Sequence, residues 1–300
     1  MSALRFALDH PANQSRRMRT VLRWSLHNLR RRVAPWQVIS VPFGPTTVVG
    51  PVGHPVVNLV RYVYGGLYDH DAFHALMTLL GPGDTFIDVG ASIGAYSVLA
   101  GSVVGPQGLV VAVEPAPEEL PHLRSNLGRI ASRTVVVTTA LADERRSVQL
   151  RGGSTLQHLE EARGTASSVT STLDEVLSGL DFDERRSFAK IDVEGWDSAV
   201  VAGGRAWLAR RPIGLLLEAN GLECRSPVAW SELVALVHNA GLRFVWPDFR
   251  DGAVHEFREP PARSPFDNYF ALCPEALTRL SQAVGRPASG SMDAQQGRVR

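Results

Sequence analysis

Residues 85–114 contain the side chains of this chain that most plainly indicate chemistry. An apolar segment leads into a turn that holds Asp88, Gly90 and Gly94, and a second apolar segment ends on Glu114. Glycines let a backbone approach a bound nucleoside closely, and a carboxylate at the next strand end accepts hydrogen bonds from ribose hydroxyls. The spacing therefore predicts a nucleoside-binding turn between two strands.

The side chains of this turn distinguish between two classes of nucleoside. A dinucleotide-binding turn has the pattern G-x-G-x-x-G, and here Ser92 and Ala95 occupy the second and third glycine places. Asp88 lies two residues before the first glycine, where its charge would repel a pyrophosphate. The same charge would attract the ammonium and sulfonium groups of S-adenosylmethionine (SAM). The turn therefore predicts SAM, and not a nicotinamide dinucleotide, as the bound cofactor.

A second group of ionisable residues lies at the end of a predicted strand near 188–192. Alternation along a strand places Lys190, Asp192 and Glu194 on one face. Three such groups are costly to bury unless they pair or bind a ligand, which makes a surface ion pair the less favoured interpretation. Glu218 ends the next predicted strand, and the carboxyl ends of parallel strands are where an open α/β sheet binds ligands. We expect these four side chains to border one pocket and to be its catalytic candidates.

Alternating apolar strands and helical patterns must position these residues. The pattern predicts a doubly wound, mainly parallel sheet with helices on both faces. Its strands are expected near residues 85–89, 109–114, 134–139, 188–192 and 213–218, with an antiparallel pair at 241–246 and 268–272. A helix capped by Asp69 is expected over 70–80, and a hairpin and loop over 142–170.

The first 67 residues are expected to form a separate N-terminal extension. Residues 15–35 contain seven arginines, no acid, and apolar residues three and four apart, which predicts a basic helix. Packing of this helix onto the domain is the favoured interpretation, and contact with an anionic lipid or partner is the alternative. Residues 37–66 predict short strands and tight turns. The main domain is expected over 68–276 and a disordered tail over 277–300.

Composition limits the classes of protein that the chain represents. A net charge of +1 and 44% hydrophobic residues indicate one domain with a full core and no overall attraction to nucleic acid. Cys224 and Cys273 match no metal or redox spacing, and Lys190 is the only lysine among 31 basic residues. No apolar run reaches the roughly 20 residues that span a bilayer, and the N-terminus shows no secretory signal. We therefore expect a cytoplasmic protein with no nucleic-acid partner, whose oligomeric state the sequence does not indicate.

Six segments of the chain resemble, in order and spacing, the FkbM-type SAM-dependent methyltransferases. They are FIDVGASIGAYS, VVAVEP, TALAD, STLDE, KIDVEGWD and LLLEANG, and the similarity covers about residues 84–272. The resemblance implies the class I methyltransferase fold, a Rossmann-like sheet of seven strands with an antiparallel last strand. It also implies methylation of a hydroxyl oxygen of a sugar, glycan or secondary metabolite, and hence modification of a natural product or carbohydrate.

The same resemblance assigns roles to residues at the cofactor side. It implies that Asp88, Gly90 and Gly94 shape the methionine end of the SAM site. Glu114 would bind the ribose hydroxyls, and Asp143 would lie near the adenine.

Ser92 departs from the asparagine usual in the family, and because serine still donates and accepts a hydrogen bond it is expected to keep its place in the SAM site. The resemblance also implies that Asp192 and Glu194 face the transfer centre. A neutral alcohol must lose a proton to accept a methyl group, which calls for a general base. Our hypothesis is that Glu194 or Asp192, ahead of Glu218, is this base, and that Lys190 holds it in place.

Two metal sites are weaker interpretations. Asp192, Glu218 and Asn220 form an oxygen-ligand set of the kind that binds Mg²⁺. His70 and His74 have the spacing of a zinc helix but lack its glutamate base and a third ligand. No metal is therefore predicted. A non-catalytic SAM-fold binding protein and, with less support, an NAD(P)-dependent oxidoreductase are the alternative functions.

Overall fold

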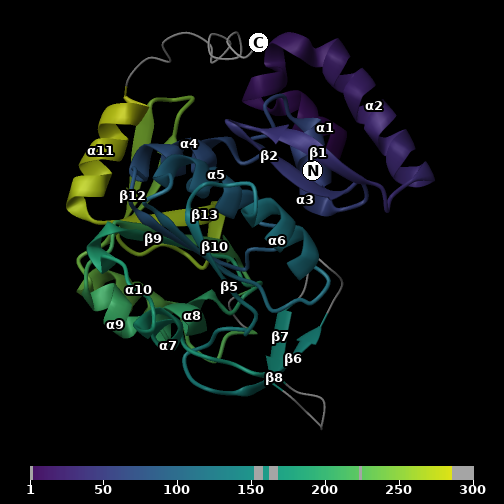
Figure 1. Cartoon of the computed structure of the whole chain (residues 1–300). Coiled ribbons are helices and arrows are strands. Elements are labelled where there is room, and N and C mark those ends of the chain that lie inside the picture. Colours follow the sequence, from purple (N-terminus) through teal and green to yellow (C-terminus); the bar gives the residue numbers. More distant parts are fainter. Residues whose placement is uncertain (1–2, 152–157, 162–167, 223–224, 286–300) are drawn as a thin grey trace.

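The computed structural model describes residues 3–151, 158–161, 168–222 and 225–285. Its centre is an eight-stranded sheet in the order β12-β11-β13-β10-β9-β3-β4-β5 (Figure 1). β5, β4, β3, β9 and β10 run parallel, whereas β13 is antiparallel to both of its neighbours, β10 and β11. The strands are β3 (Thr85–Val89), β4 (Leu109–Val113), β5 (Arg133–Val137), β9 (Ser187–Ile191), β10 (Gly214–Asn220), β11 (Arg243–Asp248), β12 (Ala253–Phe257) and β13 (Arg263–Leu272). The predicted doubly wound, mainly parallel sheet with an antiparallel last strand is confirmed, and β12 adds an edge strand through a hairpin with β11.

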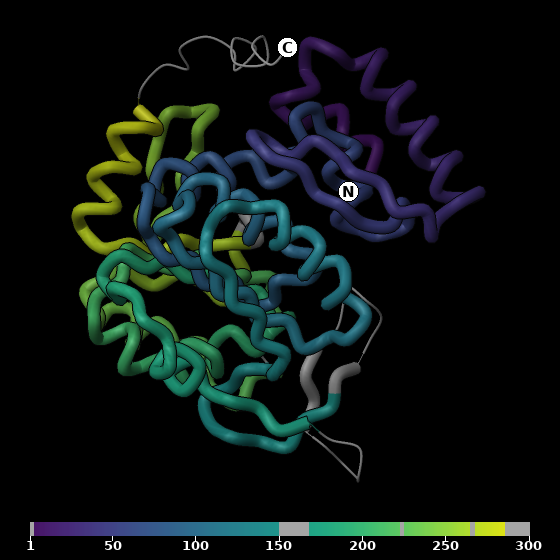
Figure 2. The backbone as a smooth tube through the Cα atoms, viewed as in Figure 1, coloured from purple at the N-terminus to yellow at the C-terminus, as the bar shows by residue number. Residues whose placement is uncertain are grey.

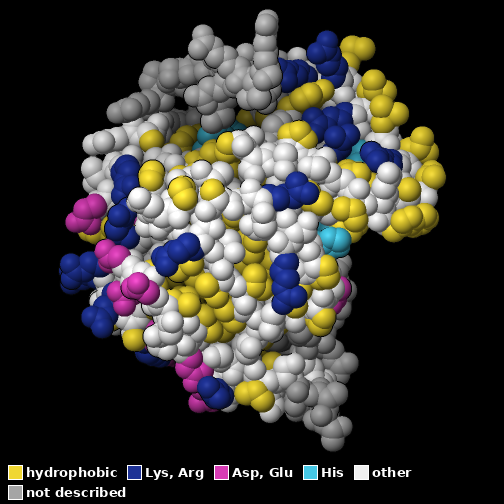
Figure 3. All heavy atoms as spheres, in the orientation of Figure 1, with side chains coloured by type: hydrophobic (Ala, Val, Ile, Leu, Met, Phe, Trp, Pro, Cys, Tyr) yellow, Lys and Arg dark blue, Asp and Glu magenta, His cyan; other side chains and the backbone are white. Residues whose placement is uncertain are grey.

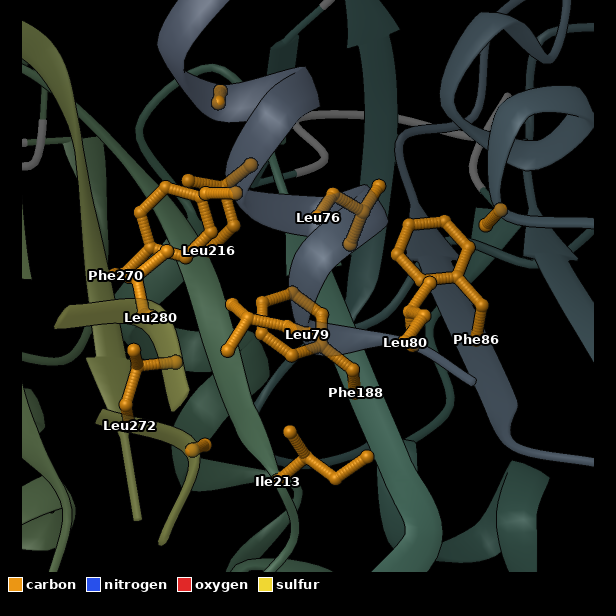
Figure 4. Close-up of a cluster of buried hydrophobic side chains, with 14 of the residues drawn as sticks. Leu76, Leu79, Leu80, Phe86, Phe188, Ile213, Leu216, Phe270, Leu272 and Leu280 are labelled. Carbon is orange, nitrogen blue, oxygen red and sulfur yellow. The ribbon is translucent and has the colours of Figure 1, made fainter. Parts of the chain in front are cut away.

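Helices cover both faces of this sheet, because successive residues of a strand point to opposite sides. In β3, Phe86 packs into a hydrophobic cluster with α4, α5, α6 and α11, and Ile87 packs into another with α7, α8, α9 and α10. Figure 4 shows part of the first cluster, in which Phe86 and Phe188 from the sheet lie with Leu79 of α4. The helices are α4 (His70–Leu79), α5 (Ala95–Val104), α6 (Leu120–Leu127), α7 (Leu173–Ser178), η2 (Glu184–Arg186), α8 (Asp197–Ala202), α9 (Arg205–Ala209), α10 (Trp230–Asn239) and α11 (Pro274–Val284).

The N-terminal segment packs beside the main sheet and is drawn in purple in Figures 1 and 2. It consists of α1 (Ala3–Asp9), η1 (Pro11–Arg16), α2 (Arg17–Val33), β1 (Val38–Phe43), β2 (Thr46–Pro51) and α3 (Pro55–Tyr62). β1 and β2 form an antiparallel hairpin, and β2 contacts α5 and α6 of the main domain. The predicted basic helix and short strands are present.

The prediction of strands and turns alone over 37–66 was wrong, because this range also contains α3. Pro55 occupies the first turn of that helix, and the His54 ring accepts a hydrogen bond from the backbone N–H of Val56 at 3.2 Å. Val57 and Val60 are fully buried. Valine has a low helix propensity, so its burial against the core, and not the local sequence preference, decides the conformation.

Two further segments differ from expectation. The stretch expected as a hairpin and loop contains an antiparallel pair, β6 (Ser147–Arg151) with β7 (His158–Glu161), to which β8 (Ser168–Val169) adds a third antiparallel strand. α11 carries ordered structure past residue 276, because Leu277 and Leu280 pack into the core. The rest of the expected tail from residue 286 lies outside the described residues, as does Cys224.

Candidate active site

A cavity of about 450 Å³ lies at the carboxyl ends of the central strands. Val89, Glu114, Ile191 and Glu218, from the ends of β3, β4, β9 and β10, all line it. Its volume is that of a small-molecule site, and its place is the one where open α/β sheets bind ligands. The cavity therefore lies at the sheet edge that the sequence predicts.

Most of the predicted site residues are brought together by this cavity. Those that line it are Gly90, Ser92, Glu114, Lys190, Asp192, Glu194 and Glu218. Asp88, Gly94 and Asp143 do not line it. Each of these three has a different place in the fold.

The turn after β3 is held to the end of β4 by backbone hydrogen bonds. The N–H of Ser92 donates to one carboxylate oxygen of Glu114 at 2.7 Å, and the N–H of Ala116 donates to the other at 2.8 Å. Burial raises the pKa of Glu114, and these two donors act against that rise. Ser92 has a φ of +50°, in the left-handed region where asparagine is enriched. The departure from the family's asparagine thus falls on a position with an unusual backbone conformation.

Two glycines of this turn have a positive φ, +80° at Gly90 and +86° at Gly94, and Gly90 is also required by packing. A Cβ atom on Gly90, whose φ is +80°, would lie 2.0 Å from the carbonyl oxygen of Asp192. A Cβ atom on Gly94 would lie 2.8 Å from Cδ1 of Leu123 in α6. Gly90 therefore allows the end of β9 to cross close to the turn, and Gly94 allows α5 to pack on α6.

Lys190 connects the cofactor turn to the end of β9. Its Nζ donates to the carbonyl oxygen of Gly90 at 3.0 Å and lies 3.1 Å from Oδ2 of Asp192. The same Nζ lies 3.6 Å from Oδ1 of Asp88, whose other oxygen accepts a hydrogen bond from Ser97 at 2.6 Å. Asp88 is fully buried beneath the turn, so it acts through Lys190 and does not face the cavity itself.

The electrostatics of this group follow from burial and pairing. Burial lowers the pKa of Lys190, but the carboxylates of Asp192 and Asp88 outweigh burial and hold that pKa above its ordinary value. Burial raises the pKa of Asp88, although the Lys190 ammonium opposes the change. Lys190 is therefore a permanent cation between two carboxyl groups.

Asp69 is a site residue that sequence reasoning missed. α4 begins at His70 as predicted, but the Asp69 side chain makes no capping hydrogen bond and lines the cavity. Its Oδ2 accepts a hydrogen bond from the Tyr96 hydroxyl at 2.8 Å and lies 3.5 Å from the amide of Asn268. Burial raises the pKa of Asp69 to about 6. No sequence signal separates this aspartate from an ordinary helix cap, because its partners come from distant segments.

Glu218 and Glu194 complete the acidic wall of the cavity. Burial, together with the carboxylates of Asp192, Asp197 and Glu194, raises the pKa of Glu218 to about 10. One of its buried oxygens has no hydrogen-bond partner among the described residues. Glu194 has a φ of +53°, which a non-glycine residue rarely adopts. Burial and the neighbouring carboxylates both favour the protonated form of Glu218, which is poorly suited to remove a proton.

Asp143 and Asn220 have partners outside the cavity. Arg146 pairs with the Asp143 carboxylate at 2.9 and 3.0 Å and holds the pKa of Asp143 below its usual range. From the TALAD segment, Ala140 and Leu141 line the cavity in its place. The side-chain oxygen of Asn220 accepts a hydrogen bond from the N–H of Leu222 at 3.0 Å. The Asn220 oxygen is therefore engaged within its own loop and, unlike Asp192 and Glu218, Asn220 does not line the cavity.

The paired histidines of α4 stack on each other. Their ring centroids lie 4.3 Å apart, Nδ1 of His70 lies 2.9 Å from the Asp71 carboxylate, and Nδ1 of His74 lies 2.8 Å from the backbone oxygen of His70. Within the described residues, no group of three or more His, Cys, Asp and Glu side chains is arranged to hold a metal ion.

The residues present fit the cofactor that the turn predicts. The cavity lining contains five carboxyl groups and one basic side chain, Lys190, among the described residues. Such a surface favours a ligand with cationic groups, and both SAM charges of this sign belong to its methionine part. The oxygens of Glu114, fixed by two backbone donors, remain acceptors for hydroxyl groups.

Comparison with known proteins gives a consistent result for the central region. Residues 88–244, just over half of the chain, match the model of the methyltransferase FkbM domain. The chain is 34% identical over 100 residues to the AMB antimetabolite synthetase AmbE of Pseudomonas aeruginosa, over 32% of this chain and 5% of that protein. It is 39% identical over 62 residues to a probable cobalt-precorrin-6B C(15)-methyltransferase (decarboxylating) of Sulfolobus acidocaldarius, over 21% of this chain and 32% of that protein. The chain thus spans a third or less of either relative.

Among solved structures, a methyltransferase FkbM from Methylobacillus flagellatus KT aligns with 89% of this chain and 62% of its own. The sequence identity is 13% and the TM-score 0.43. A precorrin-6y C5,15-methyltransferase from Geobacter metallireducens GS-15 aligns with 70% of this chain and 87% of its own, at 16% identity and a TM-score of 0.39.

Proposed function

We propose that this chain, which belongs to the FkbM family of SAM-dependent methyltransferases, transfers the methyl group of SAM to a hydroxyl oxygen of a small molecule. A sugar, a glycan or a secondary metabolite is the class of acceptor. The observation that carries the proposal is the group of acidic side chains at the ends of β9 and β10, which gives the cavity a proton acceptor beside its cofactor turn.

On the cofactor side, this chain's residues would hold SAM through charge and hydrogen bonding. Glu114 would accept the ribose hydroxyls, and Gly90 and Ser92 would form the wall of the methionine end. SAM supplies a methyl group already activated for displacement. The protein's task is therefore to align an oxygen with it and to exclude competing orientations.

We propose Asp192 as the general base. Its side chain is 38% exposed and lines the cavity, where Lys190 pairs with one oxygen and the Glu218 carboxyl shares a hydrogen bond with it. Asp69 is the second candidate, because its pKa of about 6 lies close to neutral pH, where a base works best. The two carboxylates differ in their partners, since Asp192 pairs with Lys190 and Asp69 with Tyr96.

Glu218 has a different proposed role. A carboxylic acid that stays neutral at pH 7 donates a hydrogen bond, and the buried oxygen of Glu218 has no partner among the described residues. Glu218 hydrogen-bonds with Asp192 in the structure, and it would exchange this bond for one to the oxygen of the acceptor hydroxyl, which leaves the hydroxyl proton directed toward the base.

The test is transfer of a ¹³C-labelled methyl group from SAM to a panel of sugars, polyols, phenols and matched amines. The expected product carries the label on oxygen, as identified by NMR of the purified product. Label found on nitrogen or carbon would contradict the proposal. So would the absence of transfer to every acceptor by a protein that still binds S-adenosylhomocysteine, a result that favours the non-catalytic alternative.

A further inference from the structure

α2 presents a row of large apolar side chains to solvent. Met18, Leu22, Leu26, Leu29 and Val33 are 58% to 88% exposed, and their spacing of three and four residues places them on one face of the helix. Figure 3 shows hydrophobic side chains along the outer edge of the molecule where α2 lies in Figure 1.

This row is concentrated in one part of the molecule. All the exposed large hydrophobic residues of the described chain lie between residues 18 and 38, with the single exception of Val169. Trp36, just beyond the helix, is 74% exposed. Single exposed apolar residues are common, but a contiguous row indicates a surface that binds something.

The opposite face of α2 is fixed to the protein. Thr20 and His27 are buried, and Nε2 of His27 lies 2.8 Å from the side-chain oxygen of Asn58 in α3. The Arg23 guanidinium lies over the Tyr64 ring at 4.8 Å from its centroid. These contacts set the rotation of the helix, so the apolar row faces outward because of how α2 packs.

Charge identifies the kind of partner. Residues 17–33 carry six arginines and no acid, so the rest of the chain carries a net charge of 1 − 6 = −5. Five of the six are exposed, whereas Arg23 faces the protein, and a second copy of the same face would bring exposed arginines close to each other. A bilayer with anionic lipids offers apolar acyl chains to the apolar row and negatively charged headgroups to the arginines.

We propose that α2 docks this chain on an anionic membrane surface. The apolar row lies in the boundary between headgroups and acyl chains, Trp36 lies at the headgroup level, and the flanking arginines contact lipid phosphates. The apolar row runs along the length of α2, so the helix lies parallel to the surface. No helix within the described ranges is long and apolar enough to cross a membrane. The docking is independent of which acceptor the cavity binds.

Docking also places the cavity near the surface. α2 packs against α3, and Pro55, Val56 and Leu59 of α3 line the cavity. One helix therefore separates the docked face from the cavity wall.

The experiment is flotation of the full chain with vesicles of phosphatidylcholine alone and of phosphatidylcholine mixed with phosphatidylglycerol. Binding is expected only to the mixed vesicles and is expected to fall as salt is added. Leu26→Ser and Val169→Ser form a matched pair, because both residues are exposed to a similar degree, 58% and 54%. We expect Leu26→Ser to weaken vesicle binding several-fold and Val169→Ser to leave it unchanged.

Two further variants separate the apolar from the ionic contribution. The triple variant Leu22→Ser, Leu26→Ser, Leu29→Ser is expected to weaken binding more than about 10-fold, and Arg19→Gln with Arg32→Gln is expected to reduce the salt dependence. Circular dichroism should show the same melting for all variants, because every changed side chain is exposed. Equal binding to neutral vesicles would overturn the proposal. So would a dimer, seen by light scattering without lipid, that Leu26→Ser dissociates.

Discussion

The carboxyl groups that line the cavity differ sharply in their protonation. Burial and neighbouring carboxylates raise the pKa of Glu218 to about 10, whereas burial raises that of Asp69 to about 6. Lys190 stays charged because Asp192 and Asp88 flank it. These differences support separate proposed tasks for residues of the same chemical type: Glu218 as a donor, and Asp192 or Asp69 as an acceptor.

Glu218 gives the stability of the protein a specific pH dependence. The folded state retains the Glu218 proton up to a pKa of about 10, while the unfolded chain releases it near the ordinary value of 4.5, so stability is lost as the pH rises between the two. Glu218→Gln removes this titration. As the pH rises, the free energy of unfolding of Glu218→Gln relative to that of the parent should increase by up to about 1.4 kcal/mol per pH unit.

Urea unfolding at several pH values from about pH 5 to about pH 8 measures this difference. Glu256→Gln is the control, because Glu256 lies 3.7 Å from Arg243 in an exposed pair. A Glu218→Gln advantage that stays constant with pH would show that Glu218 is charged in the folded protein.

Replacement of the proposed base should slow the methyl-transfer step. Asp192→Asn keeps the shape of the side chain but cannot take a proton, so the single-turnover rate should fall about 10²- to 10⁴-fold. The single-turnover rate of Asp69→Asn should fall by about 10-fold or less, because this change alters only the surroundings of the acceptor. If instead Asp69→Asn is the more damaging change, and the parent rate falls as the pH drops through about 6, Asp69 is the base.

The site residues at the ends of strands were easier to predict from the sequence than those in or next to helices. Lys190 and Asp192 follow from alternation along one strand, and Glu114 follows from its place at the end of the next strand. Asp69 and Tyr96 were missed because they meet through the packing of α4 against α5, which no local pattern encodes. Asp143, which is expected near the adenine, does not line the cavity, and Arg146, three residues along, pairs with its carboxylate.

At the scale of elements, the turn after β3 and the end of β9 form one packed unit. Asp88 and Lys190 are register partners in the parallel pair β3–β9, and the N–H of Asp192 donates to the oxygen of Val89 at 3.1 Å. The strands themselves were predictable because buried parallel strands are continuous apolar runs. The edge strand β12 was not, since its half-exposed residues carry no such run.

Gly90 tests this close contact between elements. Gly90→Ala places a Cβ atom 2.0 Å from the Asp192 oxygen, in addition to the strain of a φ of +80°. Gly65→Ala is the matched control, because its φ is +79° and nothing lies within 4 Å of its Cβ position. The control should lose about 1–2 kcal/mol from backbone strain alone.

Gly90→Ala should lose clearly more than Gly65→Ala, because the backbone of Asp192 must also move. The measurement is urea unfolding of both variants beside the parent. Equal losses of free energy of unfolding would mean that the end of β9 can move at no energetic cost, and that it does not form a packed unit with the turn after β3.

For the whole molecule, cofactor binding joins parts that are distant in sequence. The cavity takes residues from α3 near position 55, from the β3 turn, and from β13 at Asn268. A ligand that touches all of these binds the folded state and has no comparable site in the unfolded chain. Its binding free energy therefore adds to the stability of the whole fold.

S-adenosylhomocysteine should raise the melting temperature of the protein in proportion to the logarithm of its concentration. At a concentration of 100 times Kd the gain is about 2.7 kcal/mol in free energy of unfolding. NAD⁺ at the same concentration is the control and should leave the melting temperature unchanged. A shift with NAD⁺ and none with S-adenosylhomocysteine would contradict the reading of the β3 turn as a SAM site.

The solitary lysine has a practical consequence for spectroscopy. Because Lys190 is the only lysine in 300 residues, protein produced with ¹⁵Nζ-labelled lysine carries one labelled side-chain nitrogen. This nitrogen lies where the end of β9 meets the turn after β3. A single resonance would then report ligand entry, the state of two carboxylates and the lifetime of their contacts. Lys190 is thus a natural reporter group: no chemical tag has to be attached, and only one lysine resonance has to be assigned.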